Sequence, residues 1–147
     1  EAGVVLLTPA AGGELEPSTW LPSCRPTPIP AEDGAFWVHL GAPDVTAQDT
    51  ELVVELIEAA CTFARDPSPY LREPVVTETD DAVTITWSSS FTPVGEEPTP
   101  EKPLQAMDCP ANPVVTRTVT LAAPLGDRAL LDGSSWPARD IRGQGVW

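Results

Sequence analysis

The clearest pattern in the chain is an alternation of hydrophobic and polar residues in two segments. Residues 82–88 (AVTITWS) place valine, isoleucine and tryptophan on one side of an extended backbone, and threonine and serine on the other. Residues 114–121 (VVTRTVTL) repeat this period of two with side chains that favour strands. Residues 35–40 (AFWVHL) are rich in aromatic and branched side chains and end before Gly41. These three segments are predicted to be β-strands.

Residues 51–60 (ELVVELIEAA) fit two periods at once. The apolar positions 52, 53, 56, 57 and 60 fall on one face of a helix, with the glutamates on the opposite face. Leu52, Val54 and Leu56 also alternate as they would in a strand. Periodicity alone favours a helix, and a strand remains the alternative.

Proline and glycine divide the rest of the chain. Residues 1–33 contain a short apolar run at 4–7, a small-residue turn and several prolines. Alternate prolines favour an extended backbone that cannot form a full β-ladder. We therefore interpret residues 1–33 as an arm that either packs over the body or adds a strand to another protein. Residues 34–140 are expected to form the β domain and residues 141–147 a tail, which together predict an all-β, sandwich-like antiparallel fold.

The composition permits one domain and weighs against two classes of partner. A chain of 147 residues with 41% hydrophobic residues can build a core. The formal net charge is -14, from 22 acidic and 8 basic residues. Nucleic acid and anionic membranes are bound mainly through lysine and arginine, so neither is an expected partner. An acidic solvated surface, or a basic partner, fits the charge better.

The chain contains no apolar run long enough for a membrane-spanning helix, which needs about 20 residues. No membrane span is therefore expected. The sequence begins at Glu1 without the apolar segment of a signal peptide. We expect either that a targeting segment has been removed or that the numbering starts at a boundary within a longer chain.

Few residues are available for catalysis or metal binding. Cys24, Cys61 and Cys109 have no CxxC spacing, and His39 is the one histidine, which argues against a structural zinc site with four ligands. One disulfide with one cysteine left over is the simplest arrangement, and the residues alone allow three pairings. No G-x-S-x-G segment accompanies His39, and the acidic pairs lack the spacing of a calcium loop. We expect no enzyme, no metal and no cofactor.

The last third of the chain carries a recognisable pattern. A strand, a proline-rich loop with a cysteine, and then residues 115–134 (VTRTVTLAAPLGDRALLDGS) resemble a class of small actinobacterial exported proteins and lipoproteins. In that class a PLGDR-x-L-x-DG turn lies near the C-terminus of a disulfide-stapled β domain. The resemblance extends over about residues 50–138 and does not include the first 50 residues.

The resemblance implies structure and location rather than an activity. It implies a disulfide between Cys61 and Cys109, with Cys24 left over, and a strand at residues 51–57. It also implies a secreted or cell-surface protein. In the chain-entropy model a bond that closes such a loop stabilises the fold by about 4 kcal/mol, so we interpret it as structural.

The motif itself is interpreted as a structural turn. Pro124 ends a β-ladder, and Gly126 permits a backbone conformation that other residues resist. Arg128 is expected to pair with Asp127, Asp132 or a carboxylate on a neighbouring strand. The residues assigned to this turn are Pro124, Gly126, Asp127, Arg128, Asp132 and Gly133.

The five tryptophans suggest where a partner would bind. Trp37 and Trp87 lie on predicted strands and are expected in the core. The other three lie in irregular segments, where each ring packs over the domain's own edge or contacts another chain. The candidate interface residues are Trp20, Cys24, Trp136 and Trp147.

Two functional hypotheses follow from these patterns. The favoured one is a non-enzymatic interaction or adaptor domain in a secreted or cell-surface assembly, with a protein partner. The alternative is a free-standing secreted module that binds a small ligand or inhibits an enzyme. A monomer with an ordered arm and an exposed rigid loop, such as residues 92–113, would favour the alternative.

Overall fold

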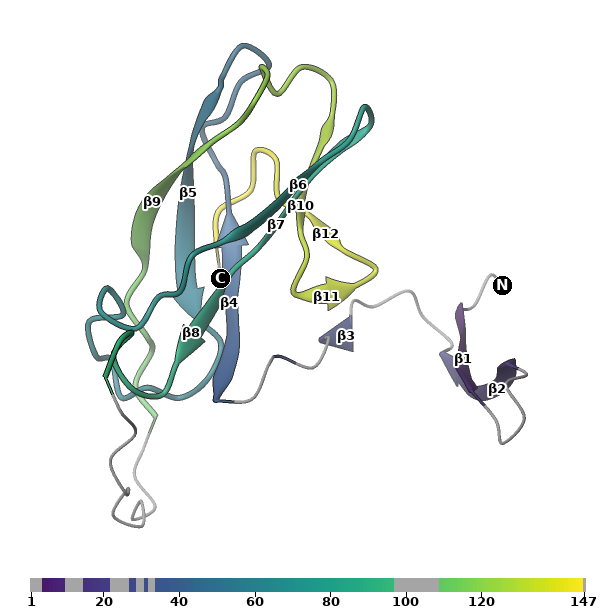
Figure 1. Ribbon diagram of the computed structural model, residues 1–147, viewed down its shortest axis with the longest axis horizontal. Coiled ribbons are helices and arrows are strands. Elements are labelled where there is room, and N and C mark those ends of the chain that lie inside the picture. The colour runs from purple at the N-terminus through teal and green to yellow at the C-terminus, as the bar shows by residue number, and fades with distance from the viewer. Residues whose placement is uncertain are drawn as a thin grey trace.

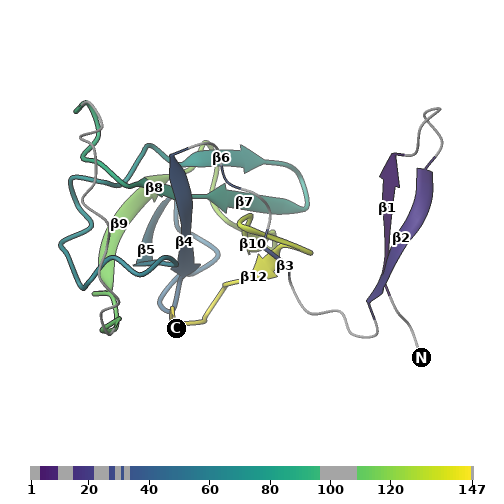
Figure 2. The same cartoon turned by 90° about the horizontal axis from the view of Figure 1, so that it is seen from below.

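The computed structural model describes residues 4–9, 15–21, 27–28, 31, 34–96 and 109–146, with backbone alone for the segments before residue 31. All regular structure in these ranges is strand, with no helix, which confirms the all-β prediction. One sheet has the order β8–β4–β5–β9, formed by Ser88–Ser90, Ala35–Gly41, Glu51–Glu58 and Val115–Thr120. The other has the order β12–β10–β7–β6, formed by Arg139–Asp140, Ala129–Asp132, Ala82–Thr86 and Val75–Glu78. The two sheets form the layers of a sandwich (Figure 1, Figure 2).

The core lies between the two sheets, and the period-two alternation of the strands fills it. Each strand turns every second side chain inward, so apolar residues at alternate positions meet those of the facing sheet. Each such side chain contributes about 1.5–3 kcal/mol when it is fully buried. The described large apolar side chains with 0% exposure are Val38, Leu40, Leu52, Val54, Leu56, Val83, Ile85, Leu125, Leu130 and Ile141.

The segment that fitted both periods is strand β5, so the helix favoured by periodicity is wrong and the strand implied by the resemblance is right. Leu52, Val54 and Leu56 are fully buried, whereas Val53 between them is 55% exposed. β5 pairs antiparallel with β4 on one side and with β9 on the other. Its position inside the sheet supplies two ladders of hydrogen bonds, which outweigh the local preference for a helix.

One strand pair departs from the predicted antiparallel arrangement. β10 runs parallel to β7, with Ala129 opposite Ala82 and Asp132 opposite Ile85. The chain leaves β9 in one sheet, crosses over the end of the sandwich and enters β10 at the end where β7 begins (Figure 1). The Ala129 amide donates to the carbonyl of Asp81 at this entry point, so β10 proceeds in the same direction as β7.

The segment set apart as a tail is part of the domain over its described residues. Ile141 is fully buried in the core, and its amide donates to the carbonyl of Leu130. The Val146 amide donates to the carboxylate of Glu55 at 2.9 Å. Gly41 lies against this segment, where an added Cβ would collide with the backbone of Val146. Described residues of 141–146 therefore pack on the domain.

The arm contains a hairpin that the sequence analysis did not predict. β1 (Val4–Pro9) and β2 (Leu15–Leu21) pair antiparallel, with a register shift between Leu6 and Leu7. Both views show this hairpin apart from the sandwich (Figure 1, Figure 2). The two-residue strand β3 (Thr27–Pro28) pairs with β11 (Ser135–Trp136) and links the arm to the body. In the described ranges no helix is long and apolar enough to cross a membrane.

Candidate functional site

Three segments that are distant in sequence meet at one end of the sandwich. They follow the end of β5, follow β8 and precede β9, respectively (Figure 1). We call residues 59–74, 91–96 and 109–114 together the loop end. Loops carried on a rigid sheet scaffold are the usual location of binding residues in β-sandwiches.

Arg65 connects the segments of the loop end. Its Nη2 and Nε atoms donate to the two carboxylate oxygens of Glu58, at 2.7 and 3.2 Å. The same guanidinium donates to the carbonyl of Ser90 at 2.8 Å and to that of Phe91 at 3.2 Å. One side chain thus ties the end of β5 to the loop that follows β8. The fork of the guanidinium suits it to a bidentate carboxylate and two carbonyls at once.

Aromatic rings hold the Arg65 guanidinium in place. Its central carbon lies 3.4 Å from the centroid of the Tyr70 ring and 5.7 Å from that of Phe36. The Phe36 ring in turn contacts that of Phe91, with centroids 5.0 Å apart. Cation–π contacts of this kind contribute about 0.5–2 kcal/mol. The cluster therefore orders both the arginine and the exposed Phe91.

Glu58 is a buried carboxylate, with a side chain that is 1% exposed. Burial by itself would raise the pKa of this carboxyl group, but hydrogen bonds from Arg65, Ser89 and Thr62 and the charge of Arg65 outweigh it and lower the pKa below 4.5. The ionised form is thus the stable form in the folded protein. Its role is structural, because its oxygens are occupied by Arg65 and Ser89.

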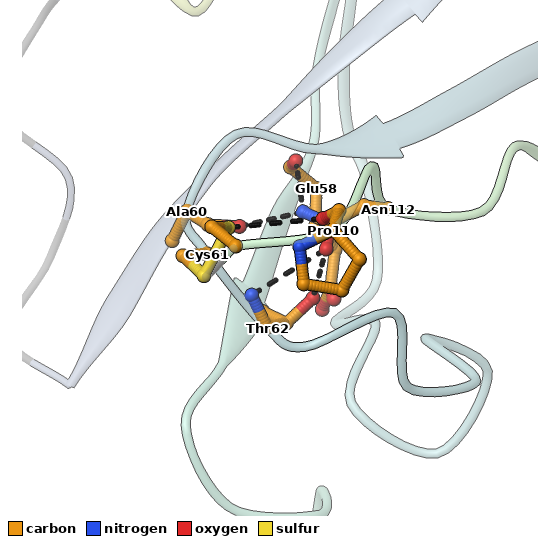
Figure 3. Close-up of a disulfide and its surroundings, with 7 residues drawn as sticks. Glu58, Ala60, Cys61, Thr62, Pro110 and Asn112 are labelled. Carbon is orange, nitrogen blue, oxygen red and sulfur yellow. Dashed lines mark hydrogen bonds between the residues drawn. A yellow bond between two sulfur atoms is a disulfide. The ribbon is translucent and has the colours of Figure 1, made fainter. Parts of the chain in front are cut away.

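The disulfide between Cys61 and Cys109 is present, as the resemblance implied, with a Cα–Cα distance of 5.7 Å. Asn112 forms a second tie beside it (Figure 3). Its Nδ2 atom donates to the carbonyls of Glu58 and Ala60, at 2.8 and 2.6 Å. Its Oδ1 atom accepts from the Thr62 hydroxyl at 2.8 Å. Both ties join the end of β5 to the segment that leads into β9.

The backbone between the disulfide and Arg65 adopts an unusual conformation. Phe63 and Ala64 both have φ of 55°, in the left-handed region that non-glycine residues seldom occupy. Each such residue costs about 1–3 kcal/mol and persists when its surroundings hold it. Thr62 and Arg65 are anchored on either side, so the strain presents Phe63 at the surface. Such outliers concentrate at functional sites.

The loop end carries an exposed apolar surface. Phe91 is 54% exposed, Val94 is 58% exposed, and Phe63 and Val114 are 37% and 49% exposed. The backbone of Val94 is held by a bond from its amide to the carbonyl of Pro69. Apolar side chains on ordered loops are typical of surfaces that bind other proteins.

The candidate interface tryptophans do not lie at the loop end where the structure describes them. Trp136 is 63% exposed and lies on β11, apart from the loop end (Figure 1). Trp20 belongs to β2, of which only the backbone is described. Cys24 and Trp147 lie outside the described residues. Trp87 is 5% exposed and belongs to the core as expected. The core position expected for Trp37 is wrong, because on β4 it lies half-buried on the face opposite the buried Phe36 and Val38.

The turn recognised in the sequence is bound to strand β6. Arg128 donates to the carboxylate of Glu78 at 2.8 Å, which is the third of the pairings considered. It also donates to the carbonyls of Ala123 and Pro124, at 3.0 and 2.9 Å. Gly126 has φ of 60°. The Arg128 guanidinium therefore makes its hydrogen bonds within the fold.

Asp132 joins the two sheets. It is 1% exposed and accepts hydrogen bonds from the amides of Leu40 and Ser134, at 3.1 and 2.9 Å. Arg139 lies 3.5 Å from the same carboxylate. A buried charge needs such partners, and these bonds attach β10 to β4.

The described residues contain no group of three or more histidines, cysteines and carboxylates that could hold a metal ion. His39 lies on the outer face of β4, opposite Ile57. A hollow of about 160 Å³ is lined by Trp37, Arg72, Glu73, Val75, Thr86 and Ser88. It is smaller than the roughly 300 Å³ at which small-molecule sites begin.

The resemblance predicted the pairing of Cys61 with Cys109, but the sequence predicted no role for Arg65, Asn112, Phe63 or Phe91. Local pattern held no signal for them, because Asn112 bonds to residues about 50 positions away. Phe63 and Ala64 are also neither glycine nor asparagine, the residues that usually indicate such a turn. No protein-family model, curated protein or solved structure matches the chain.

Proposed function

We propose that this chain is a non-enzymatic protein-binding domain, and that it binds its partner through the loop end. The observation that supports this proposal is the pairing of exposed apolar side chains with a rigid support. Phe91 and Val94 are more than half exposed, yet Arg65 and a backbone bond order the loop that carries them. A loop ordered before binding loses less conformational entropy in the complex.

The chemistry of the loop end favours a protein over a small molecule. Phenylalanine and arginine are enriched at the centre of protein interfaces, where flat apolar contact and backbone hydrogen bonds combine. The neighbouring hollow of about 160 Å³ is too small for an ordinary ligand site. This hollow therefore gives no support to the small-ligand form of the free-standing module.

An extracellular location supports the same proposal. A disulfide between Cys61 and Cys109 is consistent with an oxidising compartment. The resemblance to exported actinobacterial proteins favours a secreted or cell-surface protein. An adaptor that joins components of an extracellular assembly needs a stable fold, a binding surface and no catalytic residues.

The test uses the full chain to capture a partner from native culture supernatant and cell surface, beside a version without residues 1–33. The captured protein is purified, and its dissociation constant is measured for two valine variants. Val94→Glu places a charge on the loop end, and Val53→Glu places one on the outer face of β5. These valines are 58% and 55% exposed, which makes them a matched pair.

We expect Val94→Glu to weaken the complex by about tenfold or more, since a buried charge disfavours an apolar interface. Val53→Glu should leave the affinity nearly unchanged. Equal affinity of Val94→Glu and the parent chain would refute binding at the loop end. If only the deletion of residues 1–33 abolishes the complex, the contact lies on the arm instead.

A further inference from the structure

β6 is an edge strand whose outer backbone groups have no partner in the described part of the protein. It pairs with β7 alone, and Figure 2 shows it as the outermost strand of its layer. Thr79 bonds to the carbonyl of Ala82, so by the alternation of antiparallel ladders Thr77 and Val75 also face β7. The amide and carbonyl groups of Val76 and Glu78 then point away from the sheet.

The edges of the other sheet are covered in part. On β9, Arg117 lies on the inner face opposite Val54, and its guanidinium donates to the edge carbonyl of Thr116 at 2.8 Å. An inward-facing charge at an edge is a device that prevents strand addition. Along β8 the chain covers itself, because the Arg72 amide donates to Ser88 and the Tyr70 carbonyl accepts from Ser90. β6 carries no comparable cover among the described residues.

The outer surface beside β6 suits an added strand. Val75 is 65% exposed, and Thr77 is exposed on the same face. Val75 also lines the hollow of about 160 Å³, whose other lining residues include Trp37 and Thr86. A segment paired along β6 would pass this hollow and could place one side chain in it. Strand addition takes its affinity from backbone bonds and its specificity from pockets of this kind.

Charge selects the kind of segment. Exposed acidic residues flank the strand at both ends, with Glu73 before it and Asp80 and Asp81 after it. Glu78 within the strand is occupied by Arg128. The whole chain carries a net charge of -14, which also attracts cationic segments.

We propose that β6 accepts an extended basic segment of another protein as an added strand, with one side chain of that segment in the hollow at Val75. This surface meets the loop end at Arg72 and Glu73, which line the hollow, but the backbone groups that would pair with the segment belong to β6. The two sites therefore allow the domain to contact two partners, or two parts of one partner.

The probe is a fluorescent peptide of alternating valine and lysine, whose binding to the full chain is followed by anisotropy. Two matched peptides separate the contributions: alternating valine and glutamate tests charge, and N-methylation of alternate backbone amides of the first peptide tests hydrogen bonding. Val76→Pro removes an outward amide from β6. Thr118→Pro removes the corresponding outward amide from β9 and serves as its control.

We expect the valine–lysine peptide to bind, and N-methylation or Val76→Pro to weaken it by about tenfold or more. Thr118→Pro and Val94→Glu should have little effect, which separates this site from the loop end. Val76 also packs against the core, so amide hydrogen exchange in the parent chain provides a second measurement. Binding should slow exchange at Val76 and Glu78. Failure of the peptide to bind, indifference to N-methylation, or unchanged exchange at both amides would overturn the proposal.

Discussion

A buried carboxylate organises the loop end of this protein. Glu58 is 1% exposed and is paired with Arg65, which also reaches the carbonyls of Ser90 and Phe91. Loss of one partner from a buried pair costs about 3–5 kcal/mol, because the other charge remains in the interior. The same pair therefore supports the fold and orders the loop that carries Phe91.

The lowered pKa of Glu58 predicts a pH dependence of stability. Because the folded pKa lies below the unfolded value of about 4.5, the stabilisation is present above that pH and is lost as the pH falls through the folded pKa. In Glu58→Gln the drop in melting temperature between about pH 7 and pH 3 should be smaller than in the parent chain. Circular dichroism measures the melting temperatures of the parent chain and the variant at each pH, with Glu51→Gln as an exposed control on the same strand. An equally large drop in Glu58→Gln would contradict this role.

At the scale of the elements, two different ties join β5 to the segment that precedes β9. The disulfide links residues 48 positions apart, and Asn112 bonds to the carbonyls of Glu58 and Ala60. The disulfide acts mainly on the unfolded chain, by restricting its freedom. The asparagine acts on the folded state, where it satisfies two carbonyls at the end of a strand.

The disulfide prediction is tested by Cys109→Ser. In the chain-entropy model a loop of this length corresponds to about 4 kcal/mol, so the melting temperature should fall by several degrees. The variant should still fold, since the Asn112 bonds remain. Cys24→Ser controls for the loss of a thiol and should leave the melting temperature as it is in the parent chain. An unchanged melting temperature in Cys109→Ser would rule out a stabilising role for the bond.

The two ends of the chain relate to the sandwich in different ways. The C-terminal segment enters the core through Ile141 and bonds to β5 through Val146. On the N-terminal side, the described strand pairing with the body is that of Thr27 and Pro28 with β11. In the described residues, the C-terminal segment thus supplies a core side chain to the sandwich, whereas the arm supplies the short strand pairing of β3 with β11.

Two truncations test this difference. Deletion of residues 1–33 should leave the body folded, with a small change in melting temperature. Deletion of residues 141–147 removes the fully buried Ile141 and should destabilise by about 2–5 kcal/mol, as removal of a core isoleucine does. Thermal unfolding of both truncated proteins measures these changes in stability. Unfolding on removal of the arm would show that the arm belongs to the core.

Local pattern was sufficient for several elements of this fold. Residues 82–86, 115–120 and 35–41 are strands, as alternation or composition predicted. The all-β class followed from them, and the resemblance supplied the Cys61–Cys109 pair. The strands can be predicted from the sequence because a strand places successive side chains on opposite faces, so apolar residues occur at every second position.

Pairing partners decided the rest, and they lie far away in the sequence. β5 is a strand because β4 and β9 flank it, although its own periodicity also fits a helix. β10 is parallel to β7 because of where the chain crosses the sandwich. Arg65 and Asn112 gained their roles from partners on other segments, and the open edge of β6 exists only once the sheet order is set. In residues 82–86 and 115–120 the alternation in the sequence determined which side chains are buried; tertiary structure decided the burial in β5 and the contacts between distant segments, because such contacts leave no local period.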